Sequence, residues 1–138
     1  MAGYSGTPLS QKLGIKPGMI LVAIDPPENY RKLLEPIPGG VNFATRPTGN
    51  TKFVHLFVKE HRVLQSHLQS LRHKVAEDAA VWVSWPKKSA GVPTDVTEDV
   101  IRSVALPLGL VDIKVCAVDG TWSGLKLMIR RQNRKFNK

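Results

Sequence analysis

Short apolar runs separated by turn residues recur along the chain and predict β-strands. They occupy residues 19–24, 41–45, 53–58 and 80–85, each bounded by Gly, Pro or polar residues. The run at 19–24 is apolar at every position, which is typical of a strand covered on both faces. We therefore expect a sheet that is buried between two layers.

Helical patterns lie between these strands. The clearest helix spans 60–75, and the apolar positions of its single stripe are Leu64, Leu68, Leu71 and Val75. Shorter helices are predicted just before Gly14, at 28–35 and at 96–106. Alternation of strands and helices is typical of a parallel sheet flanked by helices.

The chain closes with two strands, at 111–118 and 121–130. Asp119-Gly120 between them is a strong hairpin signal, so one closing strand must run antiparallel at or near an edge of the sheet. The predicted fold is an α/β three-layer sandwich, Rossmann-like, with a mostly parallel sheet ending in an antiparallel hairpin. Residues 1–130 form one domain in this interpretation, and residues 131–138 form a basic, flexible tail.

The charge of the chain is concentrated at its end. The net charge is +9 over 138 residues, and five of the basic residues fall between 130 and 138. Such a tail is either a solvated, solubilising segment or an electrostatic contact for nucleic acid. The single cysteine, the absence of a membrane-length apolar run and the lack of a signal peptide predict a cytoplasmic protein.

The order of predicted elements resembles the class I S-adenosylmethionine (SAM)-dependent methyltransferase fold. "KLGIKPGMILVAI" is similar to the segment that leads into its first strand, and one helix–strand unit is missing between Thr45 and Phe53. The resemblance implies SAM as a possible cofactor. However, the first strand leads into "DPPENY" rather than a Gly-rich turn, and Thr45-Arg46-Pro47 stands where an acidic residue usually binds ribose hydroxyls. Both departures count against the usual mode of SAM binding.

The whole chain also resembles a family of small bacterial proteins, a domain of unknown function. The motifs that carry this resemblance are "AGYSGTPL", "WVSWPKK", "TDVTEDVIR" and "GLVDIKVCAVDGTWSGLK". They cover nearly the full length, and the resemblance implies no particular activity.

A metal site is not expected from the regularly spaced histidines. His61, His67 and His73 lie on one predicted helix, where a spacing of six residues turns successive side chains about 240° apart. His55 lies in a strand. The four side chains are therefore not expected to converge on one ion.

One segment concentrates candidate binding residues, at the carboxyl end of a predicted parallel strand, where open sheets bind ligands. Together with the closing hairpin, its candidates are Ser84, Trp85, Lys87, Lys88, Asp95 and Trp122. Structural roles compete with binding here. Asp95 or Thr94 could cap the next helix, with Glu98 completing a capping box, and the two lysines could pair with nearby carboxylates. Trp122 needs a covering loop, helix or partner.

The leading hypothesis from these patterns is a non-catalytic binding or accessory protein, monomeric or weakly dimeric. Its ligand would be an anionic small molecule or a protein partner, with no membrane involved. The alternatives are an enzyme with an atypical SAM or nucleotide site and a nucleic-acid binder that acts through the basic tail.

Overall fold

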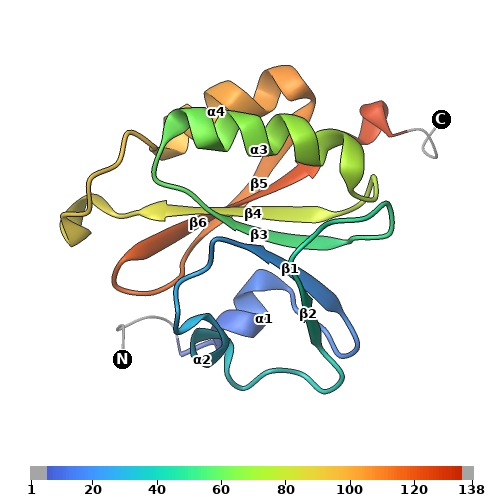
Figure 1. Cartoon of the computed structure of the whole chain (residues 1–138), viewed down its shortest axis with the longest axis vertical. Helices are drawn as coiled ribbons and strands as arrows, with labels where there is room; N and C mark the ends of the chain where they lie inside the picture. The colour runs from blue at the N-terminus through green and yellow to red at the C-terminus, as the bar shows by residue number, and fades with distance from the viewer. Residues whose placement is uncertain (1–5, 135–138) are drawn as a thin grey trace.

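A computed structural model describes residues 6–134. The molecule has three layers, with one sheet between two helical layers (Figure 1). The strands are β1 (Ile20–Ile24), β2 (Asn42–Ala44), β3 (Phe53–Phe57), β4 (Ala80–Pro86), β5 (Leu110–Ala117) and β6 (Trp122–Ile129). The α-helices are α1 (Leu9–Leu13), α2 (Tyr30–Leu34), α3 (His61–Lys74) and α4 (Glu98–Ala105), and short 3₁₀ turns are η1 (Lys88–Ala90), η2 (Leu106–Leu108) and η3 (Arg131–Asn133).

The strand order is β2-β1-β3-β4-β6-β5. The first four strands are parallel, whereas β6 runs antiparallel between β4 and β5. The predicted three-layer sandwich, its mostly parallel sheet and its closing hairpin are therefore confirmed. Figure 1 shows α3 and α4 on one face of the sheet and α1 and α2 on the other.

Alternation along the strands divides the core into two halves. Val54 and Leu56 of β3 face α3 and α4, where Leu64 and Leu68 of the predicted apolar stripe are fully buried. Phe53 and Phe57 face α1 and α2. Because successive strand residues point to opposite faces, one short strand contributes to both halves of the core.

The edge formed by β1 and β2 is less covered than the sequence predicts. Residues 45–52 join β2 to β3 without a helix or a strand, which agrees with the helix–strand unit missing from that place. Ile20 is 59% exposed. The expectation that β1 is covered on both faces is therefore wrong at Ile20, because no helix follows β2.

The last described residues stay close to the domain. Arg131–Asn133 form η3, and the Arg134 Nε donates to the Ile129 carbonyl over 2.9 Å. The remaining tail lysines, Lys135 and Lys138, lie outside the described residues, as does the beginning of the "AGYSGTPL" motif. No helix within 6–134 has the length and apolarity needed to cross a bilayer.

Candidate functional site

A cleft opens at the carboxyl ends of β1 and β3. The chain leaves β1 to form β2 on one side and β3 on the other, so the order of the strands switches here. Open α/β sheets bind ligands at such a switch point. The cleft has a volume of about 670 Å³, and its lining residues are Asp25, Pro26, Pro27, Phe57, Val58, Lys59, Glu60, Val63, Pro93 and Trp122.

Aromatic rings form one side of this cleft. The indole of Trp122 meets the ring of Phe57 edge-on, with ring centroids 5.1 Å apart. Phe57 in turn stacks on His55 and meets Tyr30 edge-on. Trp122 is therefore covered partly by Phe57 from the neighbouring part of the sheet, and its remaining surface lines the cleft. A flat ligand could pack against this half-buried indole.

The turn after β1 forms the opposite side. Asp25 has a φ of 54°, in the left-handed region that glycine adopts most readily. Asp is among the few other residues that tolerate it. Pro26 and Pro27 follow and supply no backbone N–H donors. This turn therefore has a left-handed residue but lacks the open, donor-rich backbone of a Gly-rich cofactor turn.

The structure places Ser84 and Trp85 inside the protein. Trp85 is 8% exposed and packs in the α3–α4 half of the core. Ser84 is fully buried and faces the other half. Because they are neighbours on β4, their side chains point to opposite faces, and neither lines the cleft.

The candidate lysines lie in the loop that follows β4. The Lys87 N–H donates to the Thr121 carbonyl over 2.8 Å, which ties this loop to the closing hairpin. Lys88 begins η1 and is exposed. The same loop later returns to the cleft, where Pro93 forms part of the lining. Of the six candidates, only Trp122 lines the cleft directly, while Lys87 and Lys88 belong to the adjoining loop.

Asp95 caps a different helix from the one that the sequence predicts. Its carboxylate accepts from the His61 N–H over 2.6 Å at the start of α3. The Thr94 hydroxyl donates to the Lys59 carbonyl over 2.7 Å, next to the same helix. The N-cap of α4 is Thr97, whose hydroxyl accepts from the Val100 N–H. Both capping alternatives are therefore wrong, because the loop packs its polar side chains against α3.

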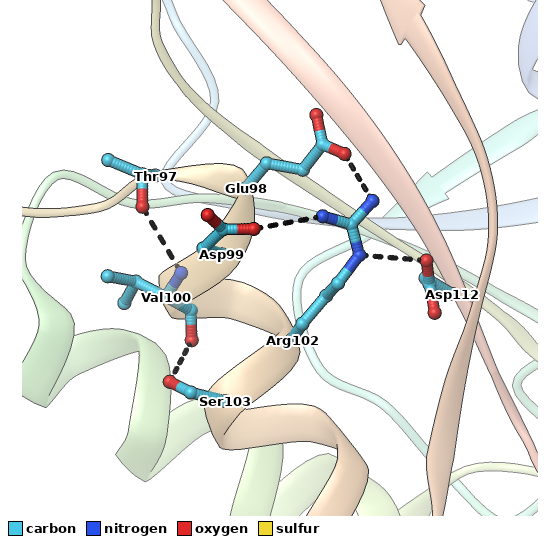
Figure 2. Close-up of polar contacts among 7 residues, drawn as sticks. All are labelled: Thr97, Glu98, Asp99, Val100, Arg102, Ser103 and Asp112. Carbon is cyan, nitrogen blue, oxygen red and sulfur yellow. Dashed lines mark hydrogen bonds and ion pairs between the residues drawn. The ribbon is translucent and has the colours of Figure 1, made fainter.

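The acidic residues of α4 pair within the helical layer. Figure 2 shows Arg102 between Glu98, Asp99 and Asp112. The Arg102 Nε donates to Asp112 over 2.9 Å, and these hydrogen bonds raise the pKa of the guanidinium and lower that of the Asp112 carboxyl. The suggested lysine partners Glu98 and Asp99 are thus engaged with Arg102, which joins α4 to β5.

A buried polar chain that the sequence reading missed lies beneath the aromatic side of the cleft. The Tyr30 hydroxyl hydrogen-bonds with His55 Nδ1, and His55 Nε2 hydrogen-bonds with the Ser84 hydroxyl, both over 2.8 Å. Burial lowers the pKa of His55 to about 3 and raises that of Tyr30. A neutral imidazole offers one donor and one acceptor, so this chain satisfies all three side chains. The sequence signal for this buried chain was the single polar residue in each of two apolar strands, His55 in "FVHLF" and Ser84 in "VWVSW".

No cluster of three or more metal-ligating side chains occurs within residues 6–134. His61 and His73 are exposed at opposite ends of α3, and His55 is engaged by Tyr30 and Ser84.

Comparison with known proteins supports the fold assignment. No family model matches the chain, and its sequence matches no curated protein. Among solved structures, a SAM-dependent methyltransferase from Aquifex aeolicus has a TM-score of 0.61 at 14% identity, covering 88% of this chain and 87% of its own. A protein assigned to the type 11 methyltransferases, from Sulfolobus solfataricus, has a TM-score of 0.59 at 13% identity, with 88% and 89% covered. The chain therefore has a methyltransferase-like fold, whereas its resemblance to the small bacterial family stays a prediction.

Proposed function

We propose that this protein is a non-catalytic binding protein that holds a small, flat, anionic molecule in the cleft at the carboxyl ends of β1 and β3. The observation that carries the proposal is the half-buried Trp122 indole in a cleft of about 670 Å³ at the switch point of the sheet. We expect the protein to act in the cytoplasm, as a monomer or weak dimer.

The charges around the cleft support an anionic group on this ligand. Lys59 lines the cleft, and Lys87 and Lys88 lie in the loop that also contributes Pro93. Carboxylates of Asp25 and Glu60 lie on the lining as well. A ligand with a phosphate or carboxylate near the lysines and hydroxyl groups near the carboxylates fits this distribution. Nucleotides and related nucleoside derivatives have this chemistry.

The turn after β1 supports binding without methyl transfer. A ligand placed as in a Gly-rich turn would meet the Asp25 side chain and two prolines that offer no N–H group. The ligand must then be held by side chains and by aromatic packing. The hydroxyl and imidazole groups of Ser84 and His55 are fully buried beneath Phe57 rather than on the cleft lining.

The test is a thermal-shift series with SAM, its demethylated product, nucleotides and acyl-CoA, followed by fluorescence titration of the indoles. At a ligand concentration 100 times Kd, linkage predicts a stabilisation of about 2.7 kcal/mol. Trp122→Leu should weaken binding at least tenfold, because the flat moiety loses its packing surface.

Charge is tested by Lys87→Ala with Lys88→Ala, matched by Lys32→Ala with Lys74→Ala, two exposed lysines outside the cleft lining. Only the first pair should weaken binding. Absence of any shift across the whole series would contradict a small-molecule function.

A second candidate, a methyltransferase with an atypical SAM site, is favoured by one observation. The fold matches two solved structures of methyltransferases, from Aquifex aeolicus and Sulfolobus solfataricus, over 88% of this chain. Its signature would be SAM binding that is lost in Trp122→Leu, together with transfer of a labelled methyl group to an acceptor. SAM binding with no transfer to protein, nucleic-acid or small-molecule acceptors would favour the binding protein.

A further inference from the structure

A second surface with a distinct chemistry lies on the sheet, away from the cleft. One row of residues crosses four strands on the face that α1 and α2 cover. His55 pairs with Trp82, Trp82 with Lys126, and Lys126 with Lys114. Because paired residues on neighbouring strands point to the same face, all four side chains share this face.

Cover along this row decreases steadily toward β5. His55 and Trp82 are fully buried. The Trp82 indole N–H donates to the Leu13 carbonyl over 3.0 Å, so α1 ends above this part of the row. Lys126 is half-buried and Lys114 is exposed. Cover by the helical layer therefore decreases along this row and leaves Lys126 half-buried and Lys114 exposed.

The two lysines stand directly opposite each other in the β5–β6 ladder. Like charges in that position repel. Partial burial and, to a smaller extent, the Lys114 charge lower the pKa of Lys126. Burial raises the pKa of the Cys116 thiol, whereas the ammonium groups of Lys12 on α1 and of Lys114 act to lower it. Lys12 and Lys114 thus lie near Cys116, and Lys126 stands opposite Lys114, so the three lysines bring positive charge to one part of this sheet face.

The shape of this patch selects among anionic partners. Lys126 is four residues from Trp122 along β6, about 13 Å at the rise of a strand, so the patch is separate from the cleft. It lies on a sheet face rather than in a pocket, and β6 leads directly into Arg130, Arg131 and Arg134. An open run of cations matches a linear polyanion with evenly spaced charges better than a compact anion.

We propose that the surface formed by Lys12, Lys114 and Lys126 binds the phosphate backbone of nucleic acid, without sequence preference. Each lysine places one ammonium against a phosphate, and Arg130, which directly follows β6, extends the contact. This differs from binding through the tail alone, because the central contacts lie on the folded sheet.

The experiment is fluorescence anisotropy with labelled oligonucleotides of about 20 nucleotides, single-stranded and duplex, over a salt series. Lys114→Gln with Lys126→Gln should lower affinity about tenfold at low salt. For single strands, the loss of two phosphate contacts should reduce the slope of log K against log salt by about 1.4. The thermal stability of this double variant should be unchanged or higher than that of the wild type, because the repulsion between the two lysines is relieved.

The matched control is Lys32→Gln with Lys74→Gln, which removes the same net charge and should leave affinity within about twofold. Deletion of residues 131–138 should weaken binding only in part. Three results would overturn the proposal: wild-type protein that does not bind either oligonucleotide, complete loss of binding on tail deletion with no effect of the Lys114 and Lys126 changes, or equal competition by poly-glutamate, which would indicate an acidic protein partner.

Discussion

The buried chain of Tyr30, His55 and Ser84 makes a specific prediction about the pH dependence of stability. In the folded protein, the pKa of His55 is about 3, because burial disfavours its charged form. In the unfolded chain its pKa is about 6.5. As pH falls below that value, the unfolded state takes up a proton that the folded state does not. The stabilisation is therefore fully present above the unfolded pKa and is lost as pH falls toward 3.

The magnitude follows from linkage. Between the two pKa values each pH unit changes the free energy of unfolding by about 1.4 kcal/mol. From about pH 7.5 to about pH 5, His55 alone should lower it by about 2 kcal/mol. The Asp78 and Asp112 carboxyls, whose pKa values are lowered by hydrogen bonds from Lys52 and Arg102, lose their contributions only at more acidic pH.

The assay is urea unfolding at several pH values across this window, with wild type, His55→Gln and His73→Gln. His55→Gln should be less stable at pH 7.5 by about 1–3 kcal/mol, because Tyr30 and Ser84 lose well-placed partners. It should also lose most of the pH dependence. His73 is exposed on α3, so His73→Gln should keep the wild-type slope. A slope that survives in His55→Gln would refute the assignment.

Three further predictions concern helix ends and charges. Thr97→Ala should lower the free energy of unfolding by about 1 kcal/mol, because it removes the N-cap of α4, and thermal unfolding of Thr97→Ser, which keeps the hydroxyl, is the control. Gly109→Ala should lower the free energy of unfolding by about 1 kcal/mol or more, because φ is 84° and a Cβ would lie 2.6 Å from the Asn133 side chain. The control is Gly120→Ala, which has open space around it and should be neutral in the same denaturation assay. Arg102→Ala should lower the Tm at low salt and less so at high salt, because α4 loses its ionic link to β5, and an unchanged salt dependence would contradict this role.

The elements were predictable from the sequence because their signals are local. Every predicted strand and helix exists. Where the prediction gave bounds, the observed ends differ from them by no more than two residues. The position of the closing hairpin followed from Asp119-Gly120, since that dipeptide favours a tight turn. The three-layer arrangement then follows from strand–helix alternation, which leaves few alternatives for burying the sheet.

The candidate site was less predictable because its residues come from distant segments. Trp85 drew attention as a tryptophan at a strand end, yet it shares a face with Val81 and Val83, and alternation places it in the core. Asp95 was read as a cap of the nearest helix, whereas the folded loop brings it to α3. The wrong cap assigned to Asp95 arises because tertiary packing overrides a local pattern. Phe57 beside Trp122 could not be foreseen without the strand order.

The turn after β1 explains how a methyltransferase-like fold can present a different cleft. The backbone there has one left-handed residue, and Asp25 adopts this conformation without glycine. The fold is therefore preserved, but the surface is changed, because a side chain and two prolines replace an open backbone with N–H donors. Under the proposed binding function, a ligand in this cleft depends on side chains from β3, β6 and the loop after β4. Phe57 and Trp122 offer a packing surface for that ligand. The turn after β1 adds few backbone hydrogen bonds to it, because its two prolines lack N–H groups. Under the proposed binding function, the same replacement that disfavours the usual cofactor makes the aromatic side of the cleft the main determinant of ligand choice.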